Sequence, residues 1–224
     1  MTMTTASTLS EFSRTDAFTP AELDQFAQQG FIVLRDFADP AIVSRMCQVT
    51  SEHLERELPP LEYEADLSYP GAPATFDAPG GRTVRRLKQA HARDIVFTEW
   101  VTAAPLVRRL QQILGGPVVM PCAHHNCIMT KAPGYSSETH WHQDIRYWSF
   151  DLPELISVWV ALGDESESNG ALQVIPGTHA MEIDRGRLDR DLFLRPELPD
   201  NARLIEAAVP MELQQGDVLF FHCR

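Results

Sequence analysis

Two side chains in the segment 139–144 (THWHQD) could bind a metal ion together. His142 and Asp144 are two residues apart, and on a strand that spacing places an imidazole and a carboxylate on the same face. One histidine, one carboxylate and a second histidine from a distant strand form the facial triad of non-haem Fe(II) oxygenases. A histidine and an aspartate at this spacing also occur as a simple hydrogen-bonded pair. The motif alone leaves both interpretations open.

The segments that must position these side chains follow residue 117 and are typical of short strands, because turns rich in Gly, Pro, Asn and Ser separate them. The predicted strands are Val118–Cys122, Asn126–Lys131, His140–Asp144, Leu155–Leu162, Leu172–Ile175, Leu204–Val209 and Asp217–Phe221.

Helices are predicted upstream of the strands. Thr19, Pro20 and Glu22 indicate a capping box and a helix start, and Gly30 is expected to end that helix. Two further helices are expected, from about residue 39 to the Pro59-Pro60 pair and from about residue 94 to residue 114, and Pro105 allows a break in the latter. A short buried strand, 31–34, is predicted between the first two helices. Residues 59–82 are rich in proline and are interpreted as a loop over the domain that could act as a lid.

The length of 224 residues, with 44% hydrophobic and 22% charged residues, is typical of one globular domain. We therefore treat 1–224 as a single domain, with a helical part at about 18–116 and a β core at about 117–224. This order of elements predicts a mainly β fold with flanking helices, either a sandwich or a barrel.

The charge and the ends of the chain exclude several functions. Nineteen basic against thirty-one acidic residues give a net charge of −12, which disfavours binding to nucleic acid or to anionic membranes. No apolar run reaches the roughly 18–20 residues that cross a bilayer. The first residues have neither the basic start nor the apolar stretch of a secretory signal, so we expect no leader. The four cysteines lack the spacing of a zinc or disulfide framework. We expect a cytoplasmic protein with a small-molecule substrate; its oligomeric state is not predicted.

An ordered series of motifs resembles the phytanoyl-CoA dioxygenase family of Fe(II)- and 2-oxoglutarate-dependent oxygenases. The motifs are THWHQD (139–144), SVWVA (157–161), NGALQVIPGTH (169–179), GDVLFFH (216–222) and the N-terminal QQGFIVLR (28–35). The resemblance implies a double-stranded β-helix (jelly roll, cupin-like) with His142 and Asp144 as the catalytic iron ligands. It also implies 2-oxoglutarate and O2 as cosubstrates. An aspartate at 144, where a halogenase has no carboxylate, fits a hydroxylase.

The resemblance further implies which side chains contact 2-oxoglutarate. Lys88, Cys127, Lys131 and Trp159 match positions that bind the cosubstrate in relatives, and His125 matches a position on the substrate side. Each also has a purely structural interpretation. Lys88 could belong to a solvated basic run, Cys127 could be a small buried hydrophobe, and Trp159 could be part of the core.

The sequence departs from the family pattern at its end. The family's third iron ligand, a histidine, and an arginine that pairs with 2-oxoglutarate follow the GDxxxFH motif by several residues. Here the sequence ends at Arg224. We expect the natural protein to continue beyond this point, and His222 is the fallback for the third ligand.

The expected activity is hydroxylation of a C–H bond with release of succinate and CO2. Two alternatives stay open. One is a catalytically inactive jelly-roll protein that binds or senses a ligand. The other is a Zn²⁺ or Mn²⁺ hydrolase or isomerase that uses the same pocket. The sequence does not identify the substrate.

Overall fold

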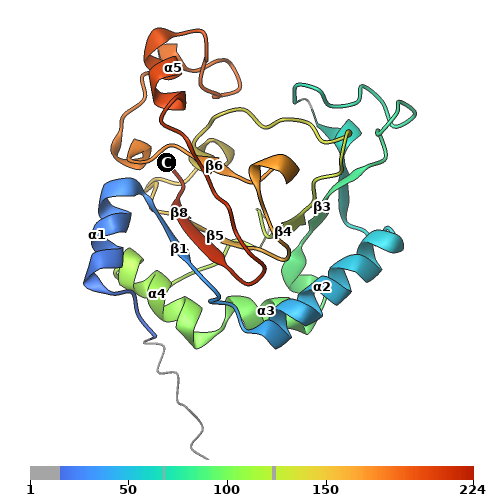
Figure 1. Ribbon diagram of the computed structural model, residues 1–224, viewed down its shortest axis with the longest axis horizontal. Coiled ribbons are helices and arrows are strands. Elements are labelled where there is room, and N and C mark those ends of the chain that lie inside the picture. The colour runs from blue at the N-terminus through green and yellow to red at the C-terminus, as the bar shows by residue number, and fades with distance from the viewer. Residues whose placement is uncertain (1–15, 68, 123–124) are drawn as a thin grey trace, which may run out of the picture.

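The computed structural model describes residues 16–67, 69–122 and 125–224 (Figure 1). The predicted absence of a leader rests on residues 1–15, which lie outside the described part. The α-helices of the described residues are α1 Pro20–Gln29, α2 Pro40–Glu55, α3 Ile95–Val101, α4 Ala104–Leu114 and α5 Pro199–Ile205. The strands are β1 Phe31–Leu34, β2 Leu61–Tyr63, β3 Val84–Lys88, β4 Cys127–Met129, β5 Ile156–Val160, β6 Gln173–Val174, β7 Val209–Pro210 and β8 Val218–His222.

The start and end of α1 confirm the prediction from the sequence. The hydroxyl of Thr19 accepts a hydrogen bond from the backbone N–H of Glu22, while the Glu22 carboxylate accepts one from the backbone N–H of Thr19. Pro20 occupies the first turn, where its missing N–H costs nothing. Gly30 ends the helix in the left-handed conformation, at φ +84°. The chain can therefore turn directly into β1.

The central sheet joins the two ends of the chain. Its order is β1–β8–β5, with antiparallel pairing throughout and with Phe31 opposite Phe221 and Ser157 opposite Phe221. Strand β8 thus lies between a strand from the start of the sequence and one from its β-rich half. This pairing needs contacts over almost 190 residues, which no local pattern specifies.

The two faces of this sheet have different partners. One face, which carries Val158 and Phe220, packs in the main hydrophobic cluster together with residues of α1 to α4. In Figure 1 those helices run from the left side of the molecule, at α1, along its lower edge to the lower right, at α2. The opposite face carries Trp159, Leu219 and Phe221, and packs with residues around β6 and β7 in a second, smaller cluster. We call it the inner face.

Two further antiparallel sheets complete the β structure. One has the order β2–β3–β4 and the other pairs β6 with β7. The predicted loop at 59–82 is therefore only partly irregular, because it contains β2 and the 3₁₀ turn Glu64–Asp66. Strand β3 was not predicted, since its sequence VRRLK has too many cations to suggest a strand. Pairing on both edges stabilises β3 despite that composition.

Several predicted boundaries are wrong. Residues 118–122 form no strand: Val118 packs against the main hydrophobic cluster, but Val119 is 88% exposed. Residues 204–209 contain the end of α5 and only the beginning of β7, because Pro199 starts a helix there. The helix expected from about residue 94 to 114 is two helices, α3 and α4. It breaks just before Pro105, which has no N–H to donate to the preceding turn.

Within the described ranges, no helix is both long enough and apolar enough to cross a membrane.

Candidate metal centre

His142 and Asp144 meet although they do not lie on a strand. The chain from 140 to 143 is irregular, and Asp144 begins the 3₁₀ turn Asp144–Tyr147. The expected strand is therefore wrong, but the expected convergence is found. The Nε2 atom of His142 lies 3.3 Å from Oδ1 of Asp144. We call this pair the HxD site.

The orientation of the His142 ring suits a metal ligand. Its Nδ1 atom lies 2.6 Å from the backbone carbonyl oxygen of His140. A carbonyl can only accept, so Nδ1 carries the proton and Nε2 is left to coordinate or to take a second proton. Nε2 and the Asp144 carboxylate then face one point, where a divalent cation satisfies both. The two residues fit two positions of an iron site.

Asp144 is held from the central sheet. The hydroxyl of Ser157, on the inner face of β5, donates a hydrogen bond of 3.0 Å to Oδ2 of Asp144. Burial raises the pKa of Asp144, but hydrogen bonds from His142 and Ser157 and the charge of the imidazole outweigh it and hold that pKa below its usual value. Asp144 is therefore a carboxylate at neutral pH, as a metal ligand must be.

The backbone also fixes the turn that carries Asp144. The N–H of Ile145 donates to the carbonyl oxygen of Cys223, which follows β8, at 2.8 Å. The end of β8 and the HxD site are therefore neighbours.

Aromatic rings enclose His142. Tyr147 and Phe193 both meet its ring edge-on, with centroids 5.4 and 5.6 Å away. The guanidinium of Arg146 lies over the Phe193 ring at 3.8 Å and donates to the Tyr147 hydroxyl at 3.0 Å. The Tyr69 hydroxyl lies 3.0 Å from the same oxygen, so the proline-rich segment reaches the site. This wall excludes water from one side of His142.

The fallback ligand His222 lies on the wrong face. His222 on β8 pairs with Ile156 on β5, whereas the next residue pair along the two strands is Ser157 with Phe221. Its ring contacts Phe26 and His179, with centroids 6.5 and 5.7 Å away. Side chains alternate along a strand, so His222 points away from the HxD site. No group of three histidine, cysteine or carboxylate ligands is found in the part of the chain that the structure describes.

Two of the predicted cosubstrate residues are neighbours. Lys88 and Cys127 are directly opposite in the β3–β4 pair. Lys88 is exposed at the end of its strand, while burial raises the pKa of the Cys127 thiol. Strand β4 spans only Cys127–Met129, so His125 and Lys131 lie outside it. His125 has φ +50° and stacks near Tyr147, with ring centroids 4.6 Å apart.

Lys131 and Trp159 lie elsewhere. The Lys131 ammonium donates to the backbone oxygen of Ser137 at 3.2 Å, and its stem packs beside Gly170. Trp159 shares the inner face with Ser157, and its indole N–H donates to the Glu165 carboxylate at 2.9 and 3.1 Å. It is part of the second hydrophobic cluster, so the core interpretation of Trp159 also has support.

Sequence reasoning missed several residues at this site. Ser157 could have been found, because it is two positions before Trp159 on a predicted strand and so on the same face. Tyr69 and Phe193 could not, since they come from irregular segments. Glu64, Arg85 and Ser137 are each at most 1% exposed and form a buried polar cluster that no motif indicates.

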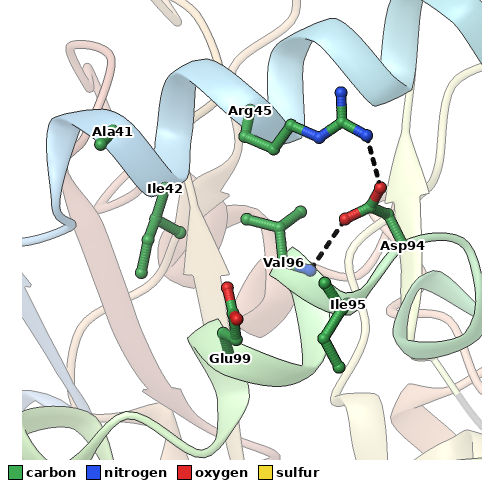
Figure 2. A pocket seen from close by; sticks show the side chains of 7 residues that line it. All are labelled: Ala41, Ile42, Arg45, Asp94, Ile95, Val96 and Glu99. Carbon is green, nitrogen blue, oxygen red and sulfur yellow. Dashed lines mark hydrogen bonds and ion pairs between the residues drawn. The ribbon is translucent and has the colours of Figure 1, made fainter.

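A cavity of about 360 Å³ lies between α2 and α3, away from these residues (Figure 2). Arg45 pairs with Asp94 across it at 2.6 Å, and the Asp94 carboxylate also accepts from the N–H of Val96 at 3.0 Å. It shares no residue with the HxD site. The ion pair joins two of its charged lining residues, Arg45 and Asp94.

Solved structures with this fold hold iron and 2-oxoglutarate. EctD from S. alaskensis, solved with 2-oxoglutarate and 5-hydroxyectoine, has a TM-score of 0.69 at 21% identity, over 92% of this chain and 68% of its own. EctD from the same source with bound Fe has a TM-score of 0.58 at 20% identity, over 92% and 69%. At these identities the likeness shows the fold alone, and it places this chain in the fold class of these proteins.

The sequence specifies the family within that class. The family model for phytanoyl-CoA dioxygenase (PhyH) matches residues 26–224. The ectoine dioxygenase of Bordetella parapertussis is 26% identical over 93% of this chain and 68% of its own length. This chain belongs to the phytanoyl-CoA dioxygenase family, as the ordered motifs predicted.

Proposed function

We propose that this protein hydroxylates a C–H bond of a small molecule and converts 2-oxoglutarate and O2 to succinate and CO2. The observation that carries the proposal is the convergence of His142 Nε2 and Asp144 Oδ1 at 3.3 Å, in a chain of this family. We further propose that its antiparallel sheets form a double-stranded β-helix, with the HxD site at the inner face.

Each residue has a task in this proposal. His142 and Asp144 hold Fe(II), and Ser157 keeps the Asp144 carboxylate in its orientation. When bound, Fe(II) and 2-oxoglutarate would supply the electrons that reduce and so activate O2. Lys131 and Lys88 supply cations for the carboxylates of 2-oxoglutarate, because an ammonium pairs with a carboxylate as a point charge. Cys127 and Trp159 border the cosubstrate.

The aromatic wall completes the site. Tyr147 and Phe193 cover His142, which keeps water away from the side where a substrate would react. No third metal ligand is assigned among the described residues. The cytoplasmic location stays a prediction.

An anaerobic titration tests the proposal. Fe(II) and 2-oxoglutarate are added to the full-length protein, and a visible charge-transfer band is expected that disappears in His142→Ala. The control is His53→Gln, which changes a histidine of α2 that touches Arg93 and should keep the band. No band in the unaltered protein would refute the proposal and favour the binding protein or the Zn²⁺ or Mn²⁺ enzyme.

A further inference from the structure

A buried polar cluster lies beside the segment that leads into the HxD site. It consists of Glu64, Arg85 and Ser137, which are 0%, 1% and 1% exposed. Glu64 comes from the 3₁₀ turn after β2, and Arg85 comes from β3. Ser137 belongs to the irregular segment between β4 and the HxD site. Three separate parts of the chain therefore meet at one buried position from which solvent is excluded.

Ser137 is the centre of the cluster. Its N–H and hydroxyl donate to Oε2 of Glu64 at 3.1 and 2.7 Å. Its carbonyl oxygen and its hydroxyl oxygen accept from Nη1 of Arg85 at 3.2 and 3.1 Å. The same Arg85 nitrogen lies 3.2 Å from Oε1 of Glu64. The backbone position of Ser137 is thereby fixed from two sides.

The cluster reaches two functional neighbours. Nη2 of Arg85 donates to the Thr139 hydroxyl at 2.7 Å, three residues before His142. The Lys131 ammonium donates to the Ser137 carbonyl oxygen at 3.2 Å, so Lys131 and Arg85 share one acceptor. Burial and the charge of Arg85 lower the pKa of Lys131, and Glu64 and Glu138 oppose this. Glu64 is the buried counter-charge for two cations.

Stability alone does not account for such a cluster. The cost of removing charges from water commonly cancels the attraction within a buried ion pair, and apolar residues of similar size serve stability equally well. A buried hydrogen-bonded network fixes one geometry where its polar atoms have defined partners. Both Glu64 oxygens, both Arg85 Nη atoms and the Ser137 hydroxyl have such partners, whereas Nε of Arg85 has none among the described residues. The geometry fixed here is that of Ser137 and, through it, of Lys131.

We propose that Glu64, Arg85 and Ser137 are positioning residues for the cosubstrate site, holding the Lys131 ammonium where it pairs with a carboxylate of 2-oxoglutarate. This inference rests on the proposed function, in which Lys131 contacts the cosubstrate. The three residues do not touch 2-oxoglutarate themselves. They act by fixing the oxygen that Lys131 binds.

The test is 2-oxoglutarate binding to the Fe(II)-loaded full-length protein without oxygen. Glu64→Gln should raise the Kd about tenfold, and Ser137→Ala, which changes no charge, should raise it several-fold. If Glu64 acted only through its charge, Glu64→Gln would lower the Kd, because the loss of an anion would tighten the binding of an anionic ligand. A purely structural role lowers thermal stability and leaves the Kd unchanged. Either result overturns the inference.

A double-mutant cycle with Lys131→Ala makes the test specific. If the cluster acts through Lys131, adding Glu64→Gln to Lys131→Ala causes no further loss, whereas additive losses refute the inference. The control is Asp217→Asn, which disrupts another buried carboxylate, paired with Arg35 at 2.7 Å, and should leave the Kd unchanged. If Lys131→Ala alone has no effect, the inference fails while the iron site still stands. If the unaltered protein shows no charge-transfer band, the proposed function itself fails.

Discussion

The hydroxyl of Ser157 lies 3.0 Å from Oδ2 of Asp144 and connects the central sheet to the HxD site. The residues just before Asp144 are irregular, so this contact from a paired strand adds to the backbone hydrogen bond between Ile145 and Cys223 in holding the carboxylate. Partners that orient a metal ligand commonly matter almost as much as the ligand.

Ser157→Ala should therefore weaken Fe(II) binding by about tenfold or more, since such partners typically contribute factors of 10–100 in affinity. Equilibrium dialysis against Fe(II) without oxygen measures the change. Ser168→Ala is the matched control, because Ser168 is exposed and its hydroxyl bonds that of Ser166 rather than a residue of the HxD site. Equal affinity in Ser157→Ala and the unaltered protein would show that Asp144 needs no support from β5.

His222→Gln should leave Fe(II) binding unchanged, because its ring lies on the face opposite the HxD site.

The same substitution should alter the response of stability to pH. Burial, with His179 and Arg224 nearby, lowers the pKa of His222, so the folded state disfavours its charged form. The contribution of His222 to the free energy of unfolding is therefore complete above about pH 6.5, the pKa of an unperturbed histidine. It is lost as the pH falls from there through the lower pKa that His222 has in the folded state. Urea unfolding at pH 7.5 and 5.5 should show a smaller difference in the variant.

Arg85→Met should destabilise the protein by about 3–5 kcal/mol, because it leaves the Glu64 carboxylate buried without its cation. The double variant Glu64→Leu with Arg85→Met should lose less than the single one. Urea unfolding at pH 7 gives both values. Arg45→Met breaks the more exposed ion pair with Asp94 and should cost no more than about 1 kcal/mol. A double variant less stable than Arg85→Met would contradict this account.

Asp217 should contribute to acid sensitivity. Burial raises its pKa, but the N–H groups of Gln214 and Asp36 and the guanidinium of Arg35 outweigh burial and lower it below the ordinary value of 3.8. Its stabilisation is therefore complete well above that value and is lost as the pH falls through the native pKa. Asp217→Asn should be less stable than the unaltered protein at pH 7, and the difference should shrink at pH 3. A constant difference in urea unfolding would contradict the prediction.

Tyr69→Phe should cost about 1 kcal/mol, because it removes one hydrogen bond to Tyr147. It should also lower the pKa of Tyr147, which burial and the Tyr69 hydroxyl raise above its usual value. Ultraviolet titration of phenolate detects the shift. Tyr135→Phe, at a residue that is 51% exposed, is the control. An unchanged Tyr147 titration would mean that the proline-rich segment does not hold this ring.

The sequence was sufficient wherever a residue's role depends on its own neighbours along the chain. The capping box of α1, the strand of Trp159 and the two-residue spacing of the HxD motif are of this kind. The order of motifs identified the family without any knowledge of contacts. These features are local, or are preserved in sequence because the chemistry requires them.

Only the tertiary structure decided what the long-range contacts do. The register of β5 against β8 places Ser157 beside Asp144 and directs His222 to the other face, and a shift by one residue would reverse both. From the sequence alone, Arg85 is expected to be one of several solvated cations in a basic run. In the structure it is buried, because Glu64 and Ser137, which are distant in the sequence, pair with it. Burial of a charge depends on partners in space, and spacing along the chain does not encode them.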